Sequence, residues 1–311
     1  MAAICELDMR TIDCNEVLQR ALDNPEGLVF ESERRFDHQV EVLASRIFEV
    51  KDISLIMIAG PSSSGKTTFS RKLQGKLQEL GVKVHYIGLD DFFIDRDKVP
   101  LLPSGLKDFD SPEAMDLPFL RRVLEGVINN EWVEVPTYNF LTGRREEELR
   151  LLRLHSQDVV VVEGIHALNP LLLKGLDTSK VCRVGICPRR TFVFPSGVEL
   201  APDELRLLRR TLRDYYTRGY SFAETARQWA EVCAAEDKYI TPYLPTADYD
   251  VDSAFDYELF VYKHCLRNDL ESCDLPAFTN LKLALREVQD LPRIHIPTGS
   301  LLNEFAQGLE D

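Results

Sequence analysis

Short runs of apolar residues alternate along the chain with longer stretches in which apolar residues recur every three or four positions. The runs predict strands at Ile53–Ala59, Lys83–Leu89, Glu134–Phe140, Val159–Ile165, Val181–Cys187 and residues 247–253. The periodic stretches predict helices at Thr67–Leu80, Asp116–Asn129, Pro202–Arg218, Phe222–Tyr239 and residues 255–266. Because strands and helices alternate, we expect an α/β fold whose parallel sheet is covered by helices on both faces.

The alternating region is flanked by an extension on each side. Residues 1–52 predict a mostly helical extension, because apolar residues recur there at helical spacing, namely Phe36, Val40, Leu43 and Ile47. Residues 267–311 predict a helical tail that packs on the rest, and an irregular link, RRTFVFPSGVEL, follows Pro188. We therefore divide the chain into an extension (1–52), a catalytic α/β domain (53–266) and a tail (267–311).

The charge of the chain restricts the partners that it can bind. Its 311 residues carry a formal net charge of −14, which disfavours nucleic acid and membrane surfaces because either needs a basic field. No stretch reaches the roughly 18 consecutive apolar residues of a membrane span, and the start MAAICELDMR does not resemble a signal peptide. The 7 cysteines lack disulfide or metal-ligand spacing, so we expect reduced thiols in a cytoplasmic protein. The sequence leaves open whether the chain forms a homo-oligomer.

A glycine-rich loop stands between the first predicted strand and the first predicted helix. Its sequence GPSSSGKT matches GxxxxGK[ST] and has the flanking strand and helix that this motif requires. Backbone N–H groups would hold phosphates, Lys66 would reach the β- and γ-phosphates, and Thr67 would contact Mg²⁺. The predicted ATP-binding residues here are Gly60, Pro61, Ser62, Ser63, Ser64, Gly65, Lys66, Thr67 and Thr68. ATP and Mg²⁺ are therefore the predicted cofactors.

Acidic residues follow two predicted strands at their carboxyl ends, where ligands bind in open α/β sheets. Asp90 is placed to orient an acceptor hydroxyl, accept its proton and lie near a metal, although the Asp90–Asp91 pair could instead cap a loop. Glu163 ends a strand of four valines, where a buried carboxylate favours a role at magnesium over a structural ion pair. The predicted metal site consists of Thr67, Asp90 and Glu163.

Four arginines share one face of the predicted helix Pro202–Arg218, and they are Arg206, Arg209, Arg210 and Arg213. The four positive charges of such a face repel one another unless an anion binds there. We therefore interpret the helix as a lid that stabilises the charge of a transferring phosphoryl group. The alternative is a solvated face paired with Asp203, Glu204 and Asp214. Combined with the loop and the carboxylates, the lid predicts an ATP-dependent phosphotransferase.

Over about residues 53–262 these pieces resemble the uridine kinase and phosphoribulokinase family of P-loop kinases. The matching stretches run in family order: GPSSSGKTTF, LDDFF, DFDSPEAMD, VPTYNF, VVVVEGIHALNP and LLRRTLRDYYTRGYSFAETARQW. The similarity is greatest to a bacterial uridine-kinase-like branch, which the tail IPTGSLLNEFAQG also resembles. That branch often carries an N-terminal TGS-type domain, for which residues 1–52 are too short. The resemblance implies a P-loop fold with an arginine-rich helical lid and a small β-hairpin in the acceptor region.

The resemblance also implies roles for residues around the phosphates. Asp90 would be the general base that accepts the proton of a ribose 5′-hydroxyl, and Lys66, Arg210 and Arg213 would complete the catalytic set. Arg213 and Arg218 would also bind the ATP phosphates, and Glu163 matches an acidic residue near magnesium.

The family pattern further implies a set of acceptor-binding residues, which are Asp90, Phe93, Phe109, Asp110, Tyr138, Phe140, Arg210 and Gln228. Asp110 would bind the sugar hydroxyls, and Tyr138 and Phe140 would pack around the base. Two positions depart from the pattern: Gly143 aligns with a histidine that reads the pyrimidine, and Phe93 aligns with a tyrosine. A site with fewer donors discriminates less, so the transferase reaction is better supported than the acceptor uridine.

The sequence therefore predicts an enzyme that phosphorylates a small-molecule hydroxyl, with the 5′-hydroxyl of a uridine-like or cytidine-like nucleoside as the expected acceptor. Other acceptors stay open, such as a sugar phosphate, a pantothenate-like acid or a purine nucleoside. A module that senses ATP without transferring phosphate is the alternative from another class. Asp90, Glu163 and the lid arginines argue against it, because a sensor needs no base.

Overall fold

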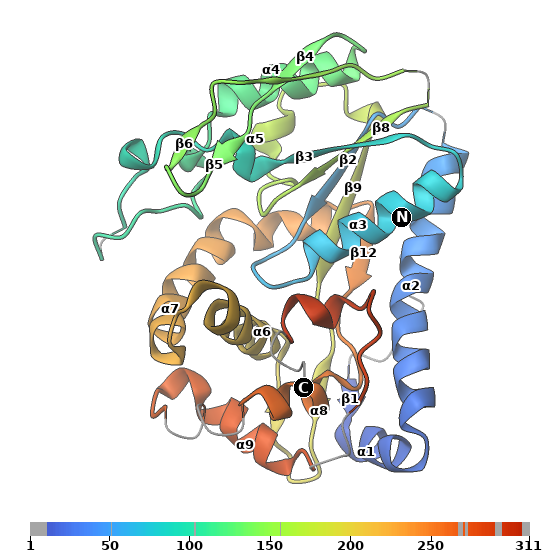
Figure 1. Cartoon of the computed structure of the whole chain (residues 1–311), viewed down its shortest axis with the longest axis vertical. Helices are drawn as coiled ribbons and strands as arrows, with labels where there is room; N and C mark the ends of the chain where they lie inside the picture. Colours follow the sequence, from blue (N-terminus) through green and yellow to red (C-terminus); the bar gives the residue numbers. More distant parts are fainter. Residues whose placement is uncertain are drawn as a thin grey trace.

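The computed structural model describes residues 11–50, 52–102, 104–155, 157–266, 270, 273–289 and 294–306. At its centre lies a parallel five-stranded sheet with the strand order β12-β9-β2-β8-β3 (Figure 1). The strands are β2 (Leu55–Ala59), β3 (Val84–Gly88), β8 (Val159–Glu163), β9 (Val181–Cys187) and β12 (Tyr249–Asp252). The register places Glu163 beside Ile58 of β2 and Gly88 of β3. The carboxyl ends of these three neighbouring strands therefore meet at one edge of the sheet.

The central strand β2 is buried on both faces of the sheet. Ile56 and Ile58 belong to a hydrophobic cluster that includes Phe69 of the first helix after the loop. Leu55 and Met57 belong to a second cluster on the opposite face. Since alternate side chains of a strand point to opposite faces, this pattern confirms the predicted α/β fold with helices on both sides.

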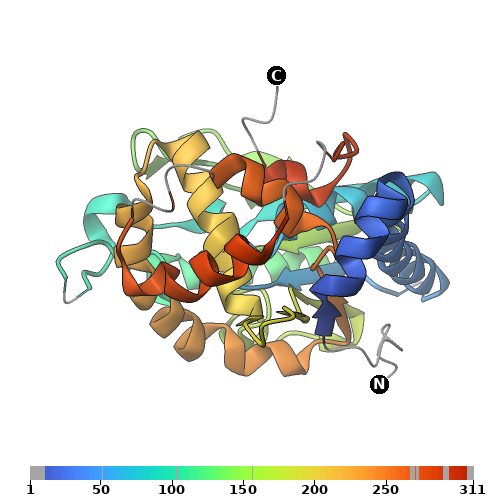
Figure 2. The ribbon, with the colours of Figure 1, turned by 90° about the horizontal axis from the view of Figure 1, so that it is seen from below.

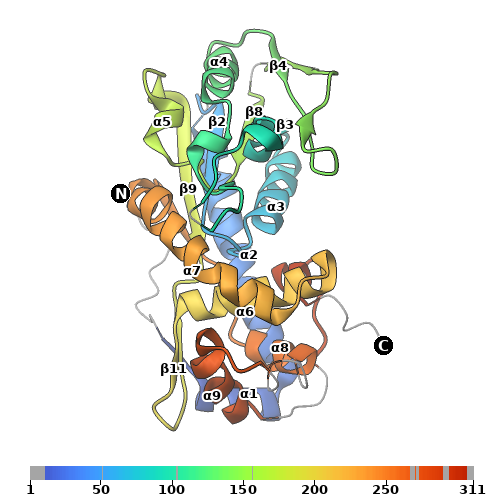
Figure 3. The same ribbon diagram turned by 90° about the vertical axis from the view of Figure 1, so that its left-hand side faces the viewer.

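The helices of the alternating region lie close to their predicted bounds. They are α3 (Lys66–Glu79), α4 (Leu117–Ile128), α6 (Pro202–Arg218), α7 (Phe222–Tyr239) and α8 (Glu258–Leu266), with a short α5 (Pro170–Leu173) that was not predicted. Gly81 and Gly219 adopt positive φ angles of 83° and 69° at the ends of α3 and α6, as expected of helix-stop glycines. Figure 3 shows α6 and α7 crossing between the sheet and a lower group of helices.

The prediction of one strand at Glu134–Phe140 was wrong. The segment forms two short strands in separate antiparallel ladders: β4 (Val133–Val135) pairs with β7 (Arg150–Leu152), and β5 (Tyr138–Asn139) pairs with β6 (Arg144–Arg145). Pro136 stands between β4 and β5 and has no N–H to donate to a ladder, so it interrupts the pairing. The second pair is the predicted hairpin of the acceptor region.

The link after Pro188 is not irregular as predicted. It forms a hairpin of β10 (Thr191–Val193) and β11 (Glu199–Leu200), with Gly197 at a φ of 86° in its turn. The short strand β1 (Thr11–Asp13) pairs in parallel with β10. The N-terminal extension thus contributes a strand, followed by the helices α1 (Cys14–Asp23) and α2 (Pro25–Glu49), which agree with the predicted helical content.

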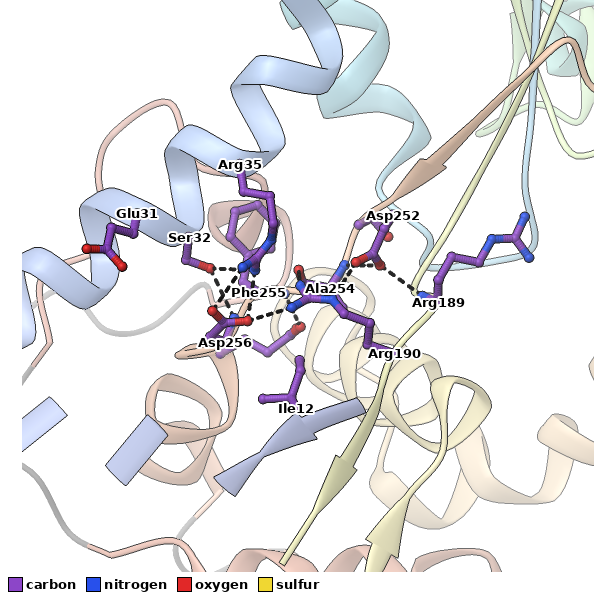
Figure 4. Close-up of polar contacts among 12 residues, drawn as sticks. Ile12, Glu31, Ser32, Arg35, Arg189, Arg190, Asp252, Ala254, Phe255 and Asp256 are labelled. Atoms are coloured by element: carbon purple, nitrogen blue, oxygen red, sulfur yellow. Dashed lines mark hydrogen bonds and ion pairs between the residues drawn. The ribbon is translucent and has the colours of Figure 1, made fainter. Parts of the chain in front are cut away.

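Buried ion pairs fasten the N-terminal extension to the end of the sheet (Figure 4). Arg35 of α2 pairs with Asp256 at 2.8 Å. Arg190, which follows β9, pairs with the same Asp256 at 2.7 Å and with Asp252 of β12 at 2.5 Å. Arg190, Asp252 and Asp256 are all buried, so the network joins three chain segments through largely desolvated charges. The three-part domain division nevertheless stays a prediction.

The tail is less helical than predicted. Within its described residues, α9 (Thr279–Glu287) is the α-helix, and the short 3₁₀ turns η6 (Pro276–Phe278) and η7 (Leu301–Glu304) add single turns. Residues Ser300–Ala306, which we call the C-terminal segment, lie beside the start of α3 in Figure 1. Figure 2 shows the red C-terminal helices on the same lower face as the blue N-terminal ones.

Two further expectations concern cysteines and membranes. The six cysteines in the described part of the chain are unpaired, and burial raises the pKa of the Cys187 thiol to about 12. In the same part of the chain, no helix is long and apolar enough to cross a membrane.

Candidate active site

The glycine-rich loop joins the end of β2 to the start of α3. At Gly60 a Cβ atom would lie 2.0 Å from the carbonyl oxygen of Ile186, so only glycine fits. Gly65 has the left-handed φ of 86° directly before Lys66, the first residue of α3. The loop backbone therefore turns tightly, and the first backbone N–H groups of α3 are directed into this turn. This geometry is the one that holds a phosphate group.

Polar groups of the loop fit a phosphate ligand. The hydroxyls of Ser63 and Ser64 are buried and have no hydrogen-bond partner among the described residues. Lys66 folds back on the loop, where its Nζ donates to the carbonyl oxygens of Gly60 at 2.9 Å and Pro61 at 3.0 Å. Burial lowers the pKa of Lys66. A triphosphate would supply acceptors to these serine and lysine groups.

Asp90 stands at the same sheet edge, in the 3₁₀ turn η1 (Leu89–Phe92) that follows β3. Solvent reaches its carboxylate, but the surrounding protein desolvates it and raises its pKa to about 6. The nearby Glu163 carboxylate adds to this rise, and Lys66 opposes it. Asp90 is therefore an ionised carboxylate at neutral pH whose pKa lies near the working range of a general base.

Glu163 is buried at the end of β8 and binds two hydroxyl groups. Its Oε2 accepts hydrogen bonds from Thr67 Oγ1 at 3.3 Å and from the Tyr86 hydroxyl at 2.8 Å. Thr67 thus contacts Glu163, and the Glu163 carboxylate is close enough to Asp90 to raise its pKa. Mg²⁺ is usually held by one or two carboxylates together with water and substrate phosphates. The described ranges contain no cluster of three or more His, Cys, Asp or Glu side chains that could enclose a metal. The metal site formed by Thr67, Asp90 and Glu163 stays a prediction.

Three lid arginines surround a single carboxylate. Arg210, Arg213 and Arg218 lie 3.3, 3.0 and 3.2 Å from the oxygens of Asp214, which is fully buried. Arg210 also donates to the Ser62 hydroxyl at 2.9 Å, so α6 contacts the loop directly. Three positive charges sharing one negative charge leave an excess that an anion can neutralise.

The other two arginines of the predicted face are held by buried glutamates, and their assignment to the lid stays a prediction. Arg206 pairs with buried Glu236 at 2.8 Å, and Arg209 pairs with Glu258 at 2.9 Å with both side chains fully buried. Both also donate to carbonyl oxygens of the loop, Arg206 to Ser62 at 3.2 Å and Arg209 to Ser63 at 3.5 Å. Neither arginine is solvated, so the alternative of a solvated face fails for these two. Helical periodicity groups residues on a face, but it does not reveal partners that other helices supply.

Four predicted acceptor residues form a chain of aromatic rings. Phe93 contacts Phe109 at 5.3 Å and Tyr138 at 5.6 Å between ring centroids, and Tyr138 contacts Phe140 at 5.2 Å. All three contacts are edge-to-face. Phe140, at the end of this chain of rings, is exposed, so its ring is available to a ligand.

Gly143, which aligns with the family's pyrimidine-reading histidine, lies in the turn of the β5–β6 hairpin with a φ of 71°. A Cβ there would lie 2.8 Å from Arg96 Cβ and 2.9 Å from Arg96 Nε. The backbone N–H of Arg96 also donates to the Gly143 carbonyl at 2.8 Å. A guanidinium group therefore stands beside the position where a histidine was expected.

The remaining two predicted acceptor residues come from different elements. Asp110 is half-buried, and desolvation raises its pKa while the nearby Arg210 guanidinium opposes the rise. Asp110 therefore lies near Arg210 of α6. Gln228 is half-buried on α7, the helix that carries Glu236, and its role stays a prediction.

Comparison with known proteins identifies the family. Residues 55–181 match the model of the phosphoribulokinase/uridine kinase family. A uridine kinase from Macrococcus caseolyticus is 30% identical over 196 residues, which are 63% of this chain and 85% of that protein. The chain belongs to the phosphoribulokinase/uridine kinase family. A second uridine kinase, from Ureaplasma parvum serovar 3, is 27% identical over 198 residues, or 63% of this chain and 86% of the relative.

The chain is also similar to a solved structure. A putative fructose transport system kinase from Silicibacter sp. TM1040 is 19% identical, covers 68% of this chain and 98% of its own, and has a TM-score of 0.48. Membership of the phosphoribulokinase/uridine kinase family makes the chain a kinase that phosphorylates a small metabolite.

Sequence reasoning missed several residues that the structure brings to the loop. Glu236 accepts the backbone N–H of Ser62 at 2.7 Å, and Tyr86 donates to Glu163. Glu304 of the C-terminal segment accepts a hydrogen bond from Thr68 Oγ1 at 2.9 Å. A Glu in a helix or a Tyr in a strand carries no motif of its own, so no local pattern could have found Glu236 or Tyr86. Glu304 lies in the tail stretch IPTGSLLNEFAQG, but that resemblance did not indicate a contact with the loop.

Proposed function

We propose that this kinase transfers the γ-phosphoryl group of ATP to the 5′-hydroxyl of a nucleoside of the uridine or cytidine type. The observation that carries the proposal is the meeting of Lys66, Asp90 and Glu163 at one edge of the sheet, where the charges of Glu163 and Lys66 both act on Asp90. A protein that only senses ATP needs phosphate-binding groups but no ionisable base beside them.

The glycine-rich loop would hold the donor. Backbone N–H groups at the start of α3 and the Lys66 ammonium would bind the β- and γ-phosphates. The Thr67 hydroxyl and the carboxylates of Asp90 and Glu163 would hold Mg²⁺. When bound, the ion would neutralise part of the charge of the phosphates.

Asp90 would act on the acceptor. Its carboxylate accepts the proton of the acceptor hydroxyl while that oxygen bonds to the γ-phosphorus and the bond to the β–γ bridging oxygen breaks. ADP leaves in line with the attacking oxygen. Arg210 and Arg213 stabilise the charge that develops on the transferring group. A pKa of about 6 keeps Asp90 ionised at neutral pH yet basic enough to accept a proton.

Two observations favour a nucleoside as acceptor. The aromatic chain of Phe109, Phe93, Tyr138 and Phe140 offers ring edges and faces against which a base can pack. Asp110 places a carboxylate near Arg210, and a carboxylate can accept hydrogen bonds from sugar hydroxyls. The curated relatives are named uridine kinases.

One observation favours a second candidate, a kinase for an acceptor that carries its own negative charge. Arg96 lies against Gly143, and Phe93 offers no hydroxyl. A guanidinium binds carboxylate and phosphate groups in preference to a neutral pyrimidine edge. A sugar phosphate or a pantothenate-like acid fits this alternative.

A panel of acceptors separates the two candidates. The measurement is kcat/KM from Mg²⁺- and ATP-dependent ADP release with uridine, cytidine, purine nucleosides, ribose phosphates and pantothenate. Highest efficiency with uridine or cytidine, unchanged within about threefold in Arg96→Ala, supports the first candidate. Highest efficiency with an anionic acceptor, lowered about tenfold or more in Arg96→Ala, supports the second. Tight ATP binding without release for any acceptor contradicts both and favours a sensor.

A further inference from the structure

The C-terminal segment, Ser300–Ala306, contacts the phosphate loop at two points. Leu301 packs so closely against Gly65 that a Cβ on Gly65 would lie 2.2 Å from its Cδ1. One turn later, the carboxylate of Glu304 accepts the hydrogen bond from Thr68 Oγ1 at 2.9 Å. Thr68 is the third residue of α3. An acidic side chain from the end of the chain therefore lies at the helix terminus where a phosphate is expected.

The position of Glu304 is fixed by buried neighbours. Leu301, Leu302 and Phe305 are fully buried around it. The Phe305 ring lies 5.3 Å from the guanidinium of Arg209, the lid-helix residue that is itself held by Glu258. The segment is thus packed against both α3 and α6, and Glu304 has little freedom to move away from Thr68.

The charge at this point opposes the binding of phosphate. A helix N-terminus attracts anions, and Glu304 already supplies one there. Glu304 is one of four carboxylates near the Lys66 ammonium, together with Glu163, Glu236 and Asp90. An anion that binds at the loop is therefore repelled by Glu304 in proportion to its own charge.

Resting on the proposed function, we propose that Glu304 makes the nucleotide site select metal-bound nucleotide over metal-free nucleotide. Mg²⁺ removes two negative charges from the phosphates, so it lowers the repulsion that Glu304 exerts. Without the metal, the nucleotide meets the full repulsion. Competition with Glu304 for the Thr68 hydroxyl affects both forms of the nucleotide equally. Glu304 thus sets the preference for metal-bound over metal-free nucleotide through its negative charge.

The test measures the binding of ADP by calorimetry, with EDTA and with Mg²⁺, to the full chain and to three variants. Glu304→Gln keeps the shape and an acceptor for Thr68 but removes the charge. Glu304→Asp keeps the charge. Glu79→Gln is the matched control, because it removes one carboxylate from the far end of the same helix, where Glu79 pairs with Lys76 on the surface. Thermal unfolding checks that each variant is folded.

We expect Glu304→Gln to bind metal-free ADP about tenfold more tightly than the unaltered protein and Mg-ADP less than about threefold more tightly. Glu304→Asp and Glu79→Gln should both bind metal-free ADP like the unaltered protein. Weaker or unchanged binding of metal-free ADP by Glu304→Gln would overturn the proposal. So would equal gains for the two forms of ADP, or a gain in Glu79→Gln. If the unaltered protein binds no nucleotide even with Mg²⁺, the proposed function itself fails.

Discussion

At the scale of the residue, the proposed phosphoryl transfer depends on one carboxylate whose environment suits a base. Desolvation and Glu163 raise the pKa of Asp90 from 3.8 to about 6, whereas the neighbouring Asp91 accepts the backbone N–H of Tyr138 at 3.1 Å and serves the hairpin. The sequence pattern LDDFF placed both residues beyond a strand but could not by itself separate them. Their different surroundings come from β8 and the hairpin, which lie elsewhere in the sequence.

The raised pKa of Asp90 predicts how activity depends on pH. The carboxylate accepts a proton only when it is ionised, so kcat should fall as the pH drops through about 6. On the acid side of the profile, a plot of log kcat against pH should have a slope of about one. A kcat that stays constant down to about pH 4.5, well below this pKa, would contradict the assignment of Asp90 as base.

The same shift predicts a gain in stability when the charge is removed. A carboxyl pKa raised above 3.8 costs folding free energy as the pH rises through the interval to about 6, and the cost persists above it. Asp90→Asn should therefore unfold at a higher temperature than the unaltered protein at pH 7, with the difference vanishing in acid. A lower unfolding temperature at pH 7 would show that Asp90 supports the fold instead.

At the scale of the element, α6 shows what sequence can and cannot predict. Its bounds follow from Pro202, the apolar stripe and Gly219, all of which are local. The local sequence does not predict which of its arginines form buried ion pairs, because their partners Glu236 and Glu258 belong to α7 and α8. The split of the segment at Pro136 is a similar case, since proline predicts an edge strand as readily as an interruption.

The two kinds of arginine on α6 should respond differently to substitution. Arg209→Ala leaves Glu258 buried without its ion-pair partner and should cost about 3–5 kcal/mol of unfolding free energy. Arg213→Ala should leave stability nearly unchanged and lower kcat about 10²- to 10³-fold. Denaturant unfolding and turnover, measured on both variants, check the distinction. A large loss of stability in Arg213→Ala, or none in Arg209→Ala, would contradict it.

At the scale of the whole molecule, α2 and the C-terminal segment both pack on the α/β part of the chain. The family match ends at residue 181, but α2 reaches Asp256 through Arg35, and the C-terminal segment contacts the loop through Leu301 and Glu304. The sequence predicted the central sheet because its strands are apolar runs. It could not predict how the ends pack, since β1 and β10 are short and their pairing is parallel between distant segments.

The buried network of Figure 4 should hold these parts together. Arg190→Ala leaves Asp252 and Asp256 without their shared partner and should cost about 3–5 kcal/mol. Arg46→Ala on the surface of α2, whose pair with Glu49 is exposed, should cost less than about 1 kcal/mol. Denaturant unfolding of both variants measures the difference, and equal losses would contradict a role for the network.

The measurement that tests the central claim most directly compares the unaltered protein with Asp90→Asn. It records Mg²⁺- and ATP-dependent ADP release with the best acceptor of the panel, and ATP binding to each protein. We predict release that depends on the acceptor and falls at least about 100-fold in Asp90→Asn, while ATP binding survives. Turnover by Asp90→Asn above about a tenth of the normal rate would contradict the role of Asp90 as general base.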